Sequence, residues 1–202
     1  MKKLVTLLIF LVVLVTTTNT ATREKETVKA EMDYYWEQLT ERVELQKIKR
    51  DKLMGLKKFL EHLALKESAN NPTIVNSYGY IGKYQFGKAA LEEVGLDSIT
   101  VNKFKDNPNV FPEELQDKAV VELMKINKRR IGRLIKQYEG TVINGIVVTE
   151  AGILGAAHLA GAGGVKKFLK SNGKYNPQDG YGTRLTKYLK EFKEHTLNLE
   201  YA

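Results

Sequence analysis

Apolar residues recur at three- and four-residue steps along most of this chain, and this spacing limits its fold more than any other feature. It predicts an amphipathic helix over residues 23–50, a second over 52–66 and a third over 112–138. The spaced apolar residues of the first helix are Val28, Met32, Tyr35, Trp36, Leu39 and Val43. Those of the second, which we expect to face the core, are Leu53, Leu56, Phe59, Leu60 and Leu63. The fold is therefore expected to be mainly α.

A small β-hairpin is expected between the longer helices. Residues 141–149 read TVINGIVVT, in which two β-branched runs flank Asn144-Gly145. An Asn-Gly pair between such runs is the strongest short-range hairpin signal. Thr149 then provides an N-cap for a helix over 150–159. The glycine-rich residues 161–164 separate that helix from a further one.

The remaining segments are predicted from their composition. Asn, Ser, Gly and Tyr dominate residues 68–85, which predicts an ordered loop with turns. Short helices are expected over 86–95 and 183–195, with a polar connection over 97–110. Residues 127–130 are expected to interrupt the third helix.

The N-terminal segment has the layout of a secretory signal. Lys2 and Lys3 come first, an apolar run extends from Leu4 to Val15, and small polar residues follow up to residue 22. The run is shorter than the roughly 18 residues of a membrane-spanning helix. We therefore expect an exported protein, periplasmic or secreted, without a stable membrane span after cleavage. An uncleaved membrane tether is the alternative.

These features divide the chain into three expected parts. They are a signal peptide over 1–22, a helical segment over 23–50 and one folded domain over 51–202. The helical segment either packs on the domain or forms a short stalk. The chain has no cysteine, which excludes disulfides, thiolate metal sites, a cysteine nucleophile and a lipidated-cysteine anchor.

The formal net charge of +8 allows two interpretations. A lysine-rich solvated surface is one, and attraction to an anionic polymer is the other. An exported protein meets the bacterial envelope before it meets nucleic acid. We saw no concentrated basic stripe in the sequence, so a nucleic-acid partner is not expected.

The passage from Glu67 to Gly87, ESANNPTIVNSYGYIGKYQFG, carries the chemistry. An acid ends an apolar helix, and amides, hydroxyls and tyrosines follow it. Sugars need such partners, because their hydroxyls bond amides and alcohols while their apolar faces stack on rings. Cleaving a glycosidic bond requires a carboxylic acid that still carries its proton, which apolar neighbours favour. The alternative is an ordinary solvated glutamate at a helix end.

The spacing of this passage resembles that of the soluble lytic transglycosylase family, which is related to goose-type lysozyme. The family pattern is Glu-Ser, then Asn-Pro, then Gly-x-x-Gly-x-x-Gln. Here Glu67-Ser68 and Asn71-Pro72 are followed by Gly79, Gly82 and Gln85, which lie 12, 15 and 18 residues after Glu67. Family members often have Ser where this chain has Asn76, Ala at Tyr80 and Met at Tyr84.

A second, weaker match lies downstream. The family's cleft-lining Ala-Tyr-Asn-Ala-Gly segment corresponds to residues 157–161, where His158 replaces Tyr and Leu159 replaces Asn. Those two departures indicate a divergent branch. The resemblance implies a lysozyme-like helical domain in which Glu67 is catalytic. The residues implied to bind substrate are Ser68, Asn76, Gly79, Tyr80, Gly82, Tyr84, Gln85, His158, Ala160, Gly161 and Tyr188.

The family's reaction needs one carboxyl group. The glutamate protonates the oxygen between N-acetylmuramic acid and N-acetylglucosamine, then acts as base toward the C6 hydroxyl of the muramic residue, which closes a 1,6-anhydro ring. The expected partner is therefore the glycan strand of peptidoglycan, bound by a monomer with no cofactor. A metal site is not expected, because His158 is far in sequence from the other two histidines.

Two other functions stay open at this point. If Asp97, Asp106, Glu150 or Asp179 faces Glu67, a lysozyme-type hydrolysis by an inverting route is favoured. If the altered residues 158–159 reflect lost activity, the domain is a non-catalytic glycan-binding module.

Overall fold

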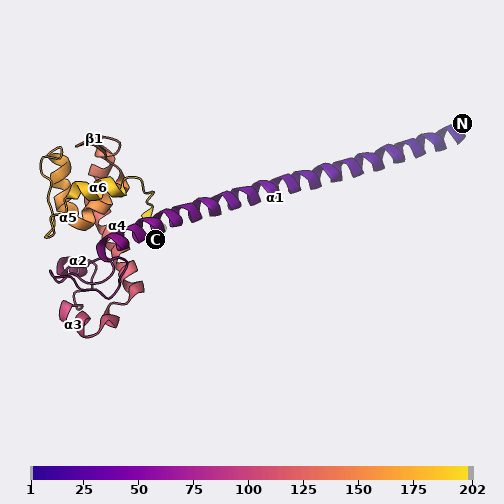
Figure 1. Ribbon diagram of the computed structural model, residues 1–202. Helices are drawn as coiled ribbons and strands as arrows, with labels where there is room; N and C mark the ends of the chain where they lie inside the picture. The colour runs from indigo at the N-terminus through magenta and orange to yellow at the C-terminus, as the bar shows by residue number, and fades with distance from the viewer. Residues whose placement is uncertain (1, 200–202) are drawn as a thin grey trace. The chain divides into compact units, whose positions relative to one another are not determined.

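The computed structural model describes residues 2–199, with side chains described for residues 22–199. The chain is mainly helical, as predicted, with one two-stranded sheet (Figure 1). Its elements in chain order are α1 (Lys2–Ser68), α2 (Lys88–Glu93), α3 (Val101–Asp106), the 3-10 helix η1 (Pro108–Val110), α4 (Glu113–Tyr138), β1 (Val142–Ile143), β2 (Ile146–Val147), α5 (Glu150–Lys170) and α6 (Leu185–Phe192). Two compact units result, Met1–Arg50 and Asp51–Ala202.

The first unit is helical throughout its described part. The expected helix over 23–50 is present, but the predicted separation from a second helix at 52–66 is wrong, since α1 continues to Ser68 without a break. No proline or glycine occurs between residues 23 and 54 to interrupt it. Val28, Tyr35 and Trp36 are more than half exposed.

The expected signal segment falls almost wholly on residues 1–21, whose side chains lie outside the described part, so it stays a prediction. Within the part of the chain that is described, no helix combines the length and the apolar character needed to cross a bilayer.

The core of the second unit forms where the end of α1 meets α4, α5 and α6. Leu56, Phe59 and Leu63 are buried, and the rings of Phe59 and Phe192 lie 4.8 Å apart. Leu53, expected on this buried face, is 41% exposed, which corrects that prediction: the face begins one turn later, where the core begins. Burial of these large side chains supplies the main driving force for the domain.

The helix α4 is longer and more regular than its sequence indicates. The predicted interruption at residues 127–130 is absent, because Asn127 is buried on the same face as Leu123 and Ile131. The segment 97–110, predicted as a polar connection, contains the short helices α3 and η1. In α3 the Thr100 side chain accepts from the backbone N–H of Lys103, and Phe104 enters the core.

The outer face of α4 carries a cluster of positive charge that was not expected from the sequence. Five cations surround a hollow of about 440 Å³: Lys125, Lys128, Arg129, Arg133 and Lys136. Lys128 forms an ion pair with Glu150 at 2.7 Å, and Arg129 forms one with Glu122 at 3.3 Å.

The hairpin is confirmed at the predicted position. Strands β1 and β2 are antiparallel and pair Ile143 with Ile146. Asn144 and Gly145 have φ angles of 52° and 74°, the left-handed pair that a type I′ turn requires. The Thr149 side chain caps α5 by accepting from the backbone N–H of Gly152 at 3.1 Å.

The predicted glycine break inside α5 is present at Gly161. Its φ of 65° and ψ of 168° are non-helical and divide α5 into two helical parts. This combination is essentially restricted to glycine, because a β-carbon makes it strained. The kink changes the direction of α5 three residues after His158.

Replacing Gly161 with alanine should therefore destabilise the protein by about 1–3 kcal/mol through backbone strain alone. No atom within 4 Å would obstruct the new β-carbon. The matched control is Gly132→Ala in α4, where the β-carbon also meets nothing and the backbone is helical. That change should stabilise by about 0.5–1 kcal/mol. Urea unfolding of the two variants would show shifts of opposite sign, and shifts of the same sign would contradict the strain at Gly161.

Candidate active site

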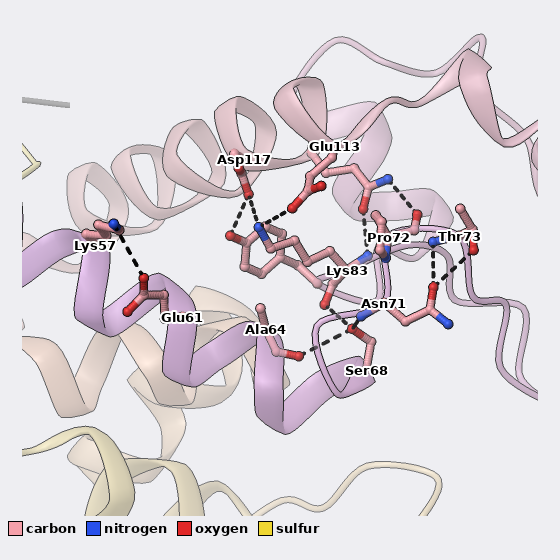
Figure 2. A network of polar contacts seen from close by, with 12 residues as sticks. Lys57, Glu61, Ala64, Ser68, Asn71, Pro72, Thr73, Lys83, Glu113 and Asp117 are labelled. Atoms are coloured by element: carbon pink, nitrogen blue, oxygen red, sulfur yellow. Dashed lines mark hydrogen bonds and ion pairs between the residues drawn. The ribbon is translucent and has the colours of Figure 1, made fainter.

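The loop that follows Glu67 is attached to the end of α1 by Ser68. After Ser68 the chain reverses through two residues with left-handed backbone, Ala69 and Asn70. The buried Ser68 hydroxyl donates to the carbonyl of Lys83 at 2.8 Å and accepts from the backbone N–H of Asn71 at 2.9 Å (Figure 2). Ser68, predicted to bind substrate, thus uses its hydroxyl to hold the two ends of the loop together.

The same loop is fixed to α4 through Gln116. The Gln116 side chain is 1% exposed; it accepts from the backbone N–H of Lys83 at 2.6 Å and donates to the carbonyls of Pro72 and Phe111. A β-carbon on Gly82 would lie 2.3 Å from the Gln116 Oε1 atom. Gly82, with φ of 75°, is therefore needed for this close approach.

Charged groups of α4 add a second attachment. The Lys83 ammonium lies 2.9 Å from Glu113 and 3.0 Å from Asp117 (Figure 2). Burial lowers the pKa of Lys83, but the hydrogen bonds to these carboxylates and their charges outweigh burial, so the net pKa lies above its ordinary value. Lys83 therefore remains a cation that holds the loop.

Tyr84, predicted to bind substrate, belongs to the core. Its side chain is 1% exposed and its hydroxyl donates to Asp117 at 2.7 Å. Burial, and then the hydrogen bond and charge of Asp117, raise the pKa of this phenol far above its usual value. What Tyr84 presents to the site is its carbonyl, which lies 2.9 Å from the His158 Nε2 atom.

Glu67 lies in the wall of a pocket of about 540 Å³. Its side chain is only 15% exposed. The Tyr188 hydroxyl donates a short hydrogen bond to Glu67 Oε1, and the His158 Nε2 atom lies 3.8 Å from the same oxygen. Burial, followed by the charge of Glu67 and the hydrogen bond to it, raises the pKa of Tyr188, so the phenol stays a neutral donor.

His158 connects Glu67 with the loop. Its side chain is 8% exposed. Its Nε2 atom bonds the Tyr84 carbonyl oxygen and also lies 3.8 Å from Glu67 Oε1. The Nδ1 atom is buried and has no hydrogen-bond partner among the described residues. The contact between Nε2 and the Tyr84 carbonyl therefore holds the ring beside the Glu67 carboxyl group.

Polar and aromatic side chains from two loops complete the pocket. Asn76, Tyr80 and Gln85 come from the loop, while Asp179 and Tyr181 come from the turn before α6. The Asn76 side-chain Oδ1 atom accepts from the backbone N–H groups of Tyr78 and Tyr80, which orders the rim.

A second hollow of about 530 Å³ adjoins the first. The two share Tyr78, Tyr80, Gln85 and His158, so together they form one extended groove. Gly79 and Gly161 line the second hollow, as their prediction as site residues requires. Of the residues predicted to bind substrate, Ser68, Gly82, Tyr84 and Ala160 line neither hollow.

Several wall residues of the pocket were not predicted as binding residues, among them Tyr78, Tyr181 and Asp179. Tyr78 falls inside the motif, at a position that the family pattern leaves open. The sequence indicated Asp179 only as a possible second carboxylate. Its Oδ1 atom accepts from the backbone N–H groups of Tyr181 and Thr183 at 2.9 and 2.7 Å.

Comparison with protein-family models, curated proteins and solved structures finds no match for this chain. Function is therefore argued from the groove itself.

On the hypothesis that Glu67 is catalytic, replacing Tyr188 with phenylalanine should lower the rate of substrate cleavage by about 10- to 100-fold, with the fold retained. The ring packing against Phe192 is kept, and only the donor to Glu67 is lost. A hydrogen bond to a charged group contributes about 1.5–3 kcal/mol, which sets that range. Tyr175→Phe, which changes an exposed tyrosine outside both hollows, is the control. Equal rates for the two variants would contradict a role for the Tyr188 hydroxyl.

Proposed function

We propose that the second unit is a peptidoglycan lytic transglycosylase with a lysozyme-like fold, in which Glu67 is the general acid and base. One observation carries the proposal: a largely buried carboxyl group, held by a neutral phenol, lies in the wall of a groove lined with amides and tyrosines. Such walls suit N-acetylated sugars, whose amides and hydroxyls need hydrogen-bond partners and whose rings stack on aromatics.

The position of the carboxyl group supports both halves of the reaction. Tyr188 holds the Oε1 atom, and no hydrogen bond within the described residues engages Oε2. Oε2 is the atom that would give its proton to the bridging oxygen and take a proton from the C6 hydroxyl. Fixing one oxygen keeps the other aimed at the substrate, which is the contribution of positioning to catalysis.

The C6 hydroxyl of the muramic residue would then attack C1 and leave a 1,6-anhydro end. This route needs no second carboxylate, because the nucleophile is already part of the bound substrate. Of the four acids considered, Asp97, Asp106 and Glu150 line neither hollow, and Glu150 is paired with Lys128.

Hydrolysis is the second candidate, and Asp179 favours it. This carboxylate lines the same pocket as Glu67, on the turn before α6. In an inverting enzyme a second carboxylate activates a water molecule on the opposite face of the sugar. Because Asp179 Oδ1 already accepts two backbone N–H groups, only Oδ2 would be available for that role.

The biological setting is part of the proposal. Residues 1–22 would direct export to the periplasm or the exterior, where glycan strands of peptidoglycan are the partner. The net charge of +8 would favour association with the anionic envelope.

The deciding experiment is a digest of purified peptidoglycan sacculi, with the products identified by mass. Anhydro-muropeptides support transglycosylation, and products with reducing ends support hydrolysis. Asp179→Asn separates the two further, since it should abolish hydrolysis and leave anhydro products. Absence of any released product would reject both and favour a non-catalytic glycan-binding module.

A further inference from the structure

The rim of the Glu67 pocket contains a contact between two loops about a hundred residues apart in sequence. The Tyr78 hydroxyl donates to the carbonyl of Gly180 at 2.8 Å. The Ser77 and Tyr181 hydroxyls lie 2.8 Å apart, and the rings of Tyr78 and Tyr181 meet edge to face at 4.9 Å. We call these four residues the tyrosine clasp.

The clasp depends on a glycine. A β-carbon on Gly180 would lie 2.6 Å from the Tyr78 ring. Only glycine therefore lets that ring lie against the backbone of the turn. The turn itself is ordered by Asp179, which accepts from two of its backbone N–H groups. The partner loop is ordered by Asn76, which binds the N–H of Tyr78.

Both clasped loops are walls of the same pocket. Tyr78 and residues 178–181 line it together with Glu67. A second contact joins two walls of the pocket, since the hydroxyl of Tyr188 in α6 donates to Glu67 in α1. The pocket is thus bounded by two cross-links, one at the catalytic carboxyl group and one at the rim.

The Glu67 pocket adjoins the second hollow, but the clasped turn belongs to the Glu67 pocket. The second hollow shares Tyr78, Tyr80, Gln85 and His158 with the Glu67 pocket, but none of residues 178–183 lines it. A strand that enters the Glu67 pocket from the second hollow would meet the clasped turn in the wall of that pocket. A continuous polymer cannot pass two walls that are bonded to each other.

We propose that the tyrosine clasp makes the Glu67 pocket a blind end, so that it accepts only the terminus of a glycan strand and the enzyme removes units from strand ends. This inference rests on the proposed function. It assigns Tyr78, Tyr181 and Gly180 to specificity for chain ends; none of them is a catalytic residue. The hydroxyl contacts are solvent-exposed and individually weak, so they can be removed without loss of the core.

The test compares the wild type with the double variant Tyr78→Phe/Tyr181→Phe, which keeps both rings and removes both hydroxyls. Glycan strands of known mean length are digested, and the chain-length distribution is followed at early times. The wild type should release small terminal units while the mean strand length stays nearly constant. Loss of two hydrogen bonds should raise the share of internal cuts by about tenfold. Tyr175→Phe is the control and should behave as the wild type.

A second measurement does not require cleavage. Glu67→Gln protein is titrated into the same strands by calorimetry, and the number of molecules bound per strand is determined. The blind pocket predicts about one molecule per strand whatever the strand length, and many per strand after the double substitution. Internal cuts by the wild type, or stoichiometry that grows with strand length, would overturn the clasp and leave the proposed function standing.

Absence of cleavage with one molecule bound per strand would reject the proposed activity and retain the clasp. Absence of both cleavage and binding would reject the two proposals together.

Discussion

Glu67→Gln should abolish release of anhydro-muropeptides from sacculi, with a fall in rate of about a thousandfold or more. The amide keeps the size of the side chain and its acceptor for the Tyr188 hydroxyl, but it has no proton to give the bridging oxygen. Mass analysis of the released fragments measures the loss. The melting temperature should stay close to that of the wild type, because the substitution removes no buried apolar contact.

Glu61→Gln provides the matched control for this loss. Glu61 lies on the same helix, is exposed and forms an ion pair with Lys57 at 3.8 Å. The same chemical change there should leave activity unaltered within about twofold, since exposed ion pairs contribute little. Activity of Glu67→Gln equal to that of Glu61→Gln would remove the assigned role of Glu67. Activity lost in both would point to damage to α1.

The sequence predicted local structure correctly where a backbone conformation requires a particular residue type. Asn144-Gly145 predicted the hairpin because its turn requires two left-handed residues. Thr149 predicted a cap, and Gly161 a break, for comparable reasons. The loop of amides and tyrosines that follows Glu67 in the sequence likewise indicated residues of the pocket, since Asn76, Tyr80 and Gln85 line it.

The failures arose where tertiary contacts decide. The helices predicted over 23–50 and 52–66 are one helix, because periodicity alone cannot place a boundary that no cap or breaker marks. The segment 97–110 was too short and too polar to reveal α3, which is fixed by the entry of Phe104 into the core. Tyr84 could equally have stacked on sugar, and only the fold shows that it is buried with its hydroxyl bonded to Asp117 of α4.

The tyrosine clasp could not be predicted from the sequence. Tyr78 and Tyr181 are two exposed tyrosines among ten in the chain, and no local pattern pairs them. Their contact exists because the loop after Glu67 and the turn before α6 line the same pocket. Gly180 was the one indication of the clasp in the sequence, but glycine is common in turns for its backbone freedom. Only the structure shows that the Tyr78 ring lies against it.

The same dependence on tertiary contacts makes Gln116 the most sensitive polar residue of the domain. Gln116→Met should lower the free energy of unfolding by about 3–5 kcal/mol, because it strands one N–H and two carbonyls that the amide now satisfies. Methionine fills nearly the same volume, so the loss reports hydrogen bonding and not a cavity. Urea unfolding followed by circular dichroism measures it.

Gln137→Met isolates this effect, since Gln137 lies in the same helix and is exposed. The control should change stability by no more than about 0.5 kcal/mol, as surface substitutions generally do. The loop that Gln116 holds carries Asn76, Tyr80 and Gln85, so the variant should also lose activity below its unfolding transition. Equal stability of the two variants would mean that the loop is held by the Lys83 ion pairs instead, and Lys83→Met would then show the larger loss.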